Sequence, residues 1–148
     1  MSTKSWFIDS SVALGAVRGE SPAAQVWFDT VQVREEPMCG SQMLLLEVDR
    51  TLCNQRLLGT QRVTPDLQGV LLGELEILDV DNALLVEAAA IQQVLRSTDA
   101  IHVASALRLG PEEVAVVTHD AQMARACQSL GFQVHDPVTD DPRRPPVA

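Results

Sequence analysis

Residues 114–118, Val-Ala-Val-Val-Thr, form a four-residue apolar run that ends in a threonine. A strand with one wet face alternates apolar and polar residues, so an unbroken run is typical of a parallel strand covered on both faces. Residues 5–9, Ser-Trp-Phe-Ile-Asp, predict a second short buried strand that ends in an acid. These two stretches indicate a sheet with helices packed on both sides.

Helical segments of about ten residues alternate with strands along the rest of the chain. We expect further strands at residues 37–40, 76–80 and 132–135. We expect helices at residues 10–19, from Pro22 onward, and at 42–58, 64–75, 82–94, 97–109 and 121–130. The helix at Pro22 carries an apolar stripe predicted to be core, with a partner or dimer surface as the alternative: Ala23, Val26, Trp27, Thr30 and Val31. Ser41 is expected to cap residues 42–58, and Ser97 or Thr98 to cap residues 97–109. This alternation predicts right-handed crossovers and a parallel sheet between helical layers.

The length of 148 residues corresponds to one domain. Residues 137–148 contain four of the eight prolines, so we expect a domain over residues 1–136 and a flexible tail over 137–148. The first apolar run is too short for a signal peptide, and no run approaches a membrane span. Three scattered cysteines indicate reduced thiols in a cytoplasmic protein.

The net charge is −9, from 11 basic and 20 acidic residues. This balance excludes a protein that holds nucleic acid by bulk electrostatics. Glycine-rich phosphate loops are also absent, which excludes common nucleotide-binding classes. If the protein acts on a polyanion, a bound divalent cation is the obvious source of local positive charge.

Three aspartates fall where the predicted elements would bring them to one edge of the sheet. Asp9 ends the first strand, and Asp120 follows the 114–118 strand closely. Asp99 lies in the first turn of a helix whose other residues are nearly all apolar. Each of the three could instead cap or complement a helix N-terminus.

Glu47 lies on the apolar side of its predicted helix. At about 100° per residue it stands about 160° around the axis from Asp49, which belongs to the solvated face. A carboxylate among apolar neighbours is costly unless it has a partner. An edge position that reaches water is the alternative. Four carboxylates near one edge would repel one another, and hard oxygen ligands in that number suit Mg²⁺ or Mn²⁺.

Four stretches of the chain resemble the motifs of the PIN-domain ribonucleases, and most closely those of the VapC toxins of bacterial toxin–antitoxin pairs. In order, they are residues 9–14 (Asp-Ser-Ser-Val-Ala-Leu), 45–48 (Leu-Leu-Glu-Val), 97–106 (Ser-Thr-Asp-Ala-Ile-His-Val-Ala-Ser-Ala) and 117–124 (Val-Thr-His-Asp-Ala-Gln-Met-Ala). The resemblance spans residues 5–136. Many relatives carry a charged residue just after the last acid, where this chain has Ala-Gln-Met.

The resemblance implies a three-layer α/β/α fold with a central sheet of four or five parallel strands. It implies an Mg²⁺- or Mn²⁺-dependent endoribonuclease, with an RNA substrate, a VapB-like antitoxin partner and a homodimeric assembly. The catalytic and metal-binding residues carried over are Asp9, Glu47, Asp99 and Asp120. Thr118 corresponds to the family's hydroxyl residue beside the site. The expected chemistry is in-line attack of an activated water on phosphorus.

Basic residues named as candidate RNA contacts are Arg18, Arg50 and Arg96, each of which could equally be a plain surface residue. His102 could touch the acids or be a hydrogen-bonded core residue. The spacing of His119 indicates neither a zinc site nor a serine or cysteine relay.

Other functions remain as alternatives. A stand-alone PIN ribonuclease in RNA processing and a non-catalytic PIN-like scaffold share the same fold. A receiver- or phosphatase-like domain would need a lysine near the site, and the single lysine, Lys4, precedes the first strand.

Overall fold

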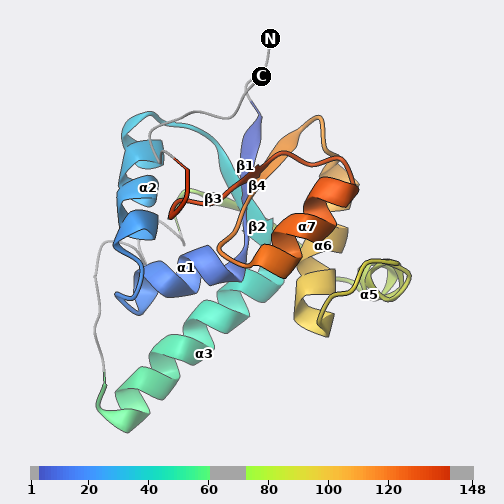
Figure 1. Cartoon of the computed structure of the whole chain (residues 1–148). Helices are drawn as coiled ribbons and strands as arrows, with labels where there is room; N and C mark the ends of the chain where they lie inside the picture. The colour runs from blue at the N-terminus through green and yellow to red at the C-terminus, as the bar shows by residue number, and fades with distance from the viewer. Residues whose placement is uncertain (1–3, 61–72, 141–148) are drawn as a thin grey trace.

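The computed structural model describes residues 4–60 and 73–140. Within these ranges five strands form one sheet in the order β3-β2-β1-β4-β5, and every neighbouring pair is parallel (Figure 1). The strands are β1 Ser5–Ile8, β2 Met38–Ser41, β3 Leu75–Leu78, β4 Val114–Val117 and β5 Val134–His135. The predicted parallel sheet is confirmed.

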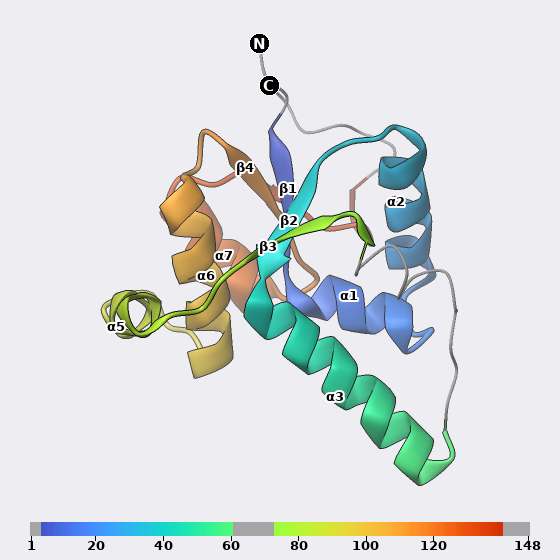
Figure 2. The same cartoon turned by 180° about the vertical axis from the view of Figure 1, so that it is seen from behind.

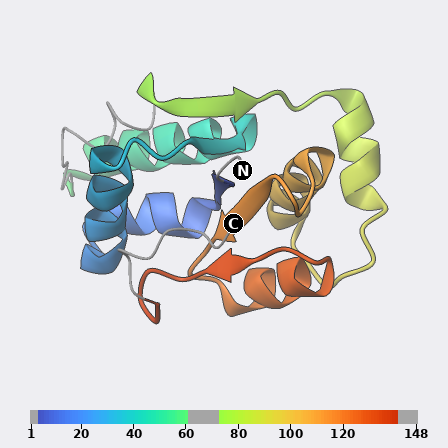
Figure 3. The same cartoon turned by 90° about the horizontal axis from the view of Figure 1, so that it is seen from above.

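Two groups of helices cover the sheet. Figures 1, 2 and 3 show α1, α2 and α3 on one side of the strands, α6 and α7 on the other, and α5 outside α6. The helices are α1 Ser10–Val17, α2 Pro22–Val33, α3 Gln42–Leu58, α5 Asn82–Ala89, α6 Ser97–Leu109 and α7 Ala121–Ser129. The molecule is therefore a three-layer α/β/α domain, as predicted.

The central strands send alternate side chains into two separate cores. In β1, Trp6 and Ile8 pack with α1, α2 and α3, whereas Phe7 packs with α6 and α7. In β4, Val117 belongs to the first core and Val116 to the second. Both faces of these strands are dry from Trp6 to Ile8 and from Val114 to Val117, which explains why every one of these positions is apolar.

The apolar stripe of α2 faces the core, but it is rotated from the predicted one. The buried side chains are Ala24, Trp27, Phe28 and Val31, while Val26 is 50% exposed. Trp27 meets Trp6 edge to face, with ring centroids 5.4 Å apart, and also contacts Phe28. The large aromatic rings determine the inward face because they bury the most apolar area.

Several predicted boundaries hold and others shift. Ser41 caps α3 by accepting from the Met43 N–H, as expected. The helix predicted at 64–75 lies mostly outside the described residues, but Leu75 begins β3 because it pairs with Met38. The helix predicted at 82–94 ends at Ala89.

Beyond Ala89 the chain turns so that Ile91 and Leu95 can pack against the core beside α6 and α7. Ser97 and Thr98 are not caps. The N-cap residue of α6 is Arg96, and it makes no side-chain cap hydrogen bond. No helix in the described segments has the length and apolar character needed to cross a membrane.

Candidate active site at the carboxyl edge of the sheet

The ends of β1 and β4 bring two predicted site residues together. Ile8 pairs with Val117 in the sheet, so the next residues, Asp9 and Thr118, emerge side by side at the carboxyl edge. The Asp9 N–H donates to the Val117 carbonyl at 3.0 Å and holds the two chains in register just past the strands. Parallel strand ends are the usual place for a functional crevice.

Asp9 is the most enclosed acid of the group, with 1% of the residue exposed. Its Oδ2 accepts hydrogen bonds from Ser11 Oγ and Thr118 Oγ1, each at 2.7 Å. Its Oδ1 is buried and has no hydrogen-bond partner. Asp9 occupies the N-cap position of α1 but makes no cap hydrogen bond, so the carboxylate is held for something other than the helix.

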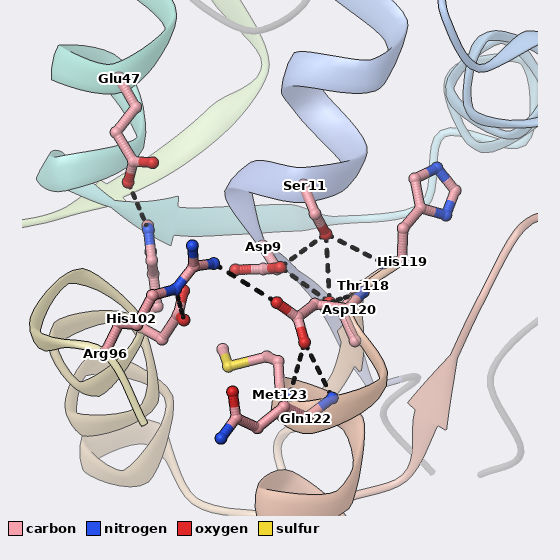
Figure 4. A network of polar contacts seen from close by, with 11 residues as sticks. Asp9, Ser11, Glu47, Arg96, His102, Thr118, His119, Asp120, Gln122 and Met123 are labelled. Carbon is pink, nitrogen blue, oxygen red and sulfur yellow. Dashed lines mark hydrogen bonds and ion pairs between the residues drawn. The ribbon is translucent and has the colours of Figure 1, made fainter. Parts of the chain in front are cut away.

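Two hydroxyl groups brace this carboxylate, Ser11 from α1 and Thr118 from the end of β4 (Figure 4). Ser11 Oγ and Thr118 Oγ1 lie 3.2 Å apart, and Ser11 Oγ accepts from the His119 N–H at 2.9 Å. Thr118 Oγ1 also accepts from the Asp120 N–H at 3.0 Å. Thr118 thus lies beside the acids, where the resemblance puts the family's hydroxyl residue.

Asp99 points inward from the first turn of α6, with 9% of its side chain exposed. Burial raises the pKa of Asp99 above its usual value, and the nearby charges of Asp9 and Asp120 act in the same direction. The Arg96 hydrogen bond and charge oppose this rise without cancelling it. The three aspartates therefore interact electrostatically, as expected of carboxylates that share one edge.

Asp120 has two roles, one for each carboxylate oxygen. Oδ1 accepts from the Gln122 and Met123 N–H groups at 2.8 and 3.1 Å and caps α7. Oδ2 lies 3.5 Å from Arg96 Nη2 (Figure 4). The capping interpretation of this residue is therefore confirmed, and its second oxygen is left to contact Arg96.

Arg96 was named from sequence only as a weak RNA-contact candidate, yet it lies among the acids. Its Nε lies 3.1 Å from Asp99 Oδ2, in addition to the contact with Asp120. The hydrogen bond and charge of Asp99, followed by the charges of Asp120 and Asp9, raise the pKa of Arg96. No local spacing signals this contact with Asp120, which is 24 residues away.

Glu47 has the partner that its apolar surroundings require. Its Oε1 lies 2.8 Å from Nε2 of His102, a residue of α6 that is fully buried. Burial raises the pKa of Glu47, but the hydrogen bond and charge of His102, with lesser contributions from Ser10 and Arg96, hold it below its usual value. His102 is thus both a core residue and a neighbour of the site.

A second chain of contacts runs through His119. Its Nε2 lies 2.9 Å from Ser21 Oγ and its Nδ1 lies 2.8 Å from Asp136 Oδ1. Sequence spacing could not reveal this because Ser21 is 98 residues away from His119. The Ser21 oxygen also accepts from the Ala24 N–H and caps α2, so the chain links that cap to the end of β4.

A hollow of about 580 Å³ adjoins this chain of contacts. Its lining includes Ser11, Gly15, Arg18, Ser21 and His119. Ser11 and His119 belong to both the hollow and the hydroxyl network around Asp9, but Asp9, Glu47, Asp99 and Asp120 are not among the lining residues. The wall carries one positive and one negative charge, from Arg18 and Glu20.

Arg96 contacts both Asp99 and Asp120, and the charges of Asp9 and Asp120 act on Asp99, so the three aspartates are neighbours. Glu47 lies against His102 of α6. By its chemistry this donor set suits a hard divalent cation, since it consists of carboxylate oxygens and includes the unpartnered Oδ1 of Asp9. Within residues 4–60 and 73–140, no three or more His, Cys, Asp or Glu side chains are positioned closely enough to hold a metal ion.

Comparison with models of known protein families identifies the family of this chain. The model of the PIN domain matches residues 6–128. No curated protein matches the chain.

Solved structures with a similar fold include three at low sequence identity. VapBC2 from Rickettsia felis, bound to a DNA fragment from its promoter, has a TM-score of 0.56 at 12% identity, covering 88% of this chain and 97% of the other. DNA-bound VapBC from Salmonella typhimurium has a TM-score of 0.57 at 18% identity, and the match covers 90% of this chain and 98% of the other. PAE2754 from Pyrobaculum aerophilum has a TM-score of 0.57 at 17% identity, and the match covers 92% of this chain and 85% of the other. At these identities the likeness concerns the fold.

Proposed function

The chain belongs to the PIN-domain family, and from that premise we propose that it is an Mg²⁺- or Mn²⁺-dependent endoribonuclease. The observation that carries the proposal is the meeting of Asp9, Asp99 and Asp120 at the carboxyl edge of the sheet. Asp9 supports it most, because its carboxylate is buried, is not a helix cap and keeps one oxygen without a partner. A buried anion with a free oxygen is costly in a protein unless a cation uses it.

In this proposal Asp9 and Asp99 hold the cation, and Glu47 and Asp120 contact it directly or through water. When bound, the ion supplies Lewis-acid stabilisation of charge and lowers the pKa of a bound water. Ser11 and Thr118 keep the Asp9 carboxylate in one orientation, and His102 does the same for Glu47.

The reaction is hydrolysis of an RNA phosphodiester. Water attacks phosphorus in line and passes a proton to Glu47 or Asp120. The bond to the 3′ oxygen breaks, and that oxygen takes up a proton and leaves as the 3′ hydroxyl. The pKa of Glu47 lies below its usual value, so this carboxylate is ionised at neutral pH and able to accept the proton.

The substrate must approach a protein with a net charge of −9. One of the three candidate arginines, Arg96, contacts the acids, while Arg18 lines a hollow that shares Ser11 and His119 with the network around Asp9. Arg50 instead lies on the exposed face of α3, where it contacts Asn54. We therefore place the RNA backbone along a path from Arg96 past the acids towards Arg18.

The decisive experiment measures cleavage of RNA by the purified protein with Mg²⁺ or Mn²⁺ and with EDTA. Asp99→Asn should lower the rate by more than about a hundredfold, because loss of even an outer partner of a metal costs about 10- to 100-fold. Asp49→Asn, an exposed acid on α3, is the matched control and should cleave at the wild-type rate. Cleavage by Asp99→Asn at the wild-type rate, or cleavage in EDTA, would overturn the proposal.

We also propose that this ribonuclease is the toxin of a type II, VapBC-like pair, with a VapB-like antitoxin as partner and a homodimeric assembly. The fold shared with VapBC proteins from Rickettsia felis and Salmonella typhimurium supports this choice. Expression of the chain should arrest growth of the host, and expression of Asp99→Asn should not. Co-expression of an adjacent gene for a small protein with a DNA-binding N-terminus should restore growth.

The same experiments separate the alternatives. Normal growth together with metal-dependent cleavage in vitro would favour a stand-alone ribonuclease in RNA processing. Absence of both Mn²⁺ binding and cleavage would favour a non-catalytic scaffold. Light scattering of the purified chain tests the dimer.

A further inference from the structure

Arg96 joins two of the candidate metal ligands through one guanidinium group. Nε lies 3.1 Å from Asp99 Oδ2, and Nη2 lies 3.5 Å from Asp120 Oδ2. Both contacts are made by carboxylate oxygens at the edge of the sheet where a cation would bind. The planar fork of a guanidinium suits this task, because its donors can serve two acceptors at once.

The Arg96 side chain is free to move away from Asp99 and Asp120. It stands at the N-cap of α6 with extended backbone, makes no cap hydrogen bond, and has 74% of its side chain exposed. Both of its charged contacts lie on the acids. Moving the guanidinium towards solvent would therefore break those two contacts without opening the core.

The acids need a positive charge in the absence of a metal. The Asp99 side chain is only 9% exposed and Asp9 is 1% exposed, so water can do little to stabilise these negative charges. Within the described residues, Arg96 is the only lysine or arginine paired with any of these three aspartates. It therefore supplies the local neutralisation that these acids would otherwise lack.

We propose that Arg96 is an exchangeable internal counter-ion: it pairs with Asp99 and Asp120 in the metal-free protein and yields them to the divalent cation. The released guanidinium then binds a phosphate of the RNA backbone beside the scissile bond. The same positive charge thus neutralises the acids in the metal-free protein and binds the substrate in the metal-bound protein. The inference rests on the proposed metal-dependent ribonuclease function and adds a residue to it.

The first test compares Arg96→Gln with wild type by titration calorimetry with Mn²⁺ and by thermal melting in EDTA. The variant should bind Mn²⁺ about two- to thirtyfold more tightly, because the ion no longer has to displace two solvent-exposed ion pairs. It should also melt at a lower temperature in EDTA, since Asp99 loses its partner. Arg50→Gln removes the same charge from the exposed face of α3 and should change neither value.

The second test follows RNA cleavage at saturating Mg²⁺ over a range of salt concentrations. Arg96→Gln should raise KM about tenfold and reduce the slope of log(kcat/KM) against log[salt] by about 0.7, the value for one phosphate contact on a single strand. Arg96→Lys keeps the charge, so it should retain the slope while losing the two-acceptor geometry. A role confined to folding would leave the salt slope unchanged.

The outcomes distinguish this inference from the proposed function. If wild type neither binds Mn²⁺ nor cleaves RNA, the proposed function fails and the role of Arg96 with it. If wild type does both while Arg96→Gln has wild-type Mn²⁺ affinity and salt slope, only the role of Arg96 is overturned. Weaker Mn²⁺ binding by Arg96→Gln would also overturn it, because Arg96 would then be holding the acids in place for the ion.

Discussion

Thr118 donates a hydrogen bond to Asp9 across the junction of β1 and β4, with 2.7 Å between Oγ1 and Oδ2, although the two residues are 109 positions apart in the sequence. Both residues are buried. The bond fixes the orientation of the Asp9 carboxylate and leaves its other oxygen free of protein partners. It is the tightest link between the two strand ends on which the candidate site is built.

Thr118→Val removes this donor while preserving the shape of the side chain. We expect a loss of about 1–2 kcal/mol in the free energy of unfolding, because a buried carboxylate loses a donor and the Asp120 N–H loses its acceptor. Urea denaturation measures the loss. Thr30→Val is the matched control, since the Thr30 hydroxyl bonds only to its own helix at an exposed position. Equal effects of the two substitutions would contradict the special role of the Thr118 bond.

Asp99→Asn should raise the melting temperature of the metal-free protein at neutral pH. The pKa of Asp99 is raised in the folded state, so its contribution to stability is fully present below its ordinary value of 3.8 and lost as the pH rises through the raised value. The advantage of the variant in EDTA should therefore grow from acid to neutral pH. Thermal melting across this range checks it, with Asp49→Asn as the exposed control. A lower melting temperature at neutral pH would contradict the mutual repulsion of the three aspartates.

Glu47→Gln should have the opposite effect on stability at neutral pH. The pKa of Glu47 lies below its ordinary value of 4.5, so the ionised group stabilises the fold above that value and loses the effect as the pH falls through the lowered pKa. We expect the variant to be less stable than wild type at pH 7, with a difference that shrinks towards acid. Glu112→Gln, at an exposed position, should show no such dependence. A difference that is constant with pH would exclude the charge of Glu47 as the cause.

Ser21→Ala tests the link between the α2 cap and His119. The hydroxyl accepts from the Ala24 N–H and contacts His119, and loss of an N-cap costs about 1 kcal/mol. We expect destabilisation of about that size in urea denaturation. Ser129→Ala removes a hydroxyl at an exposed helix end and should have an effect within about 0.5 kcal/mol. If the two variants unfold at the same urea concentration, Ser21 does not hold the cap.

Local rules were sufficient for much of this molecule. The unbroken apolar run of β4 predicted a strand buried on both faces, residues 5–9 predicted a short buried strand, and Ser41 predicted the start of α3. The cost of a carboxylate on an apolar helix face predicted a partner for Glu47. The end of α5 was missed because it depends on where Ile91 and Leu95 find a core, which no local propensity encodes.

The amino-acid sequence by itself determined the layered α/β class and the placement of Asp9 and Asp120 just beyond strands, because periodicity and strand polarity are local properties. Only the tertiary structure decided that His102 is the partner of Glu47, that Arg96 joins Asp99 to Asp120, and that Ser21 meets His119. These contacts span 24 to 98 residues, and their distances follow from the register of β1 on β4 and the packing of α6 against the sheet. A hydrogen bond requires its atoms to lie within a few tenths of an ångström of the right separation, and a sequence pattern specifies faces rather than distances.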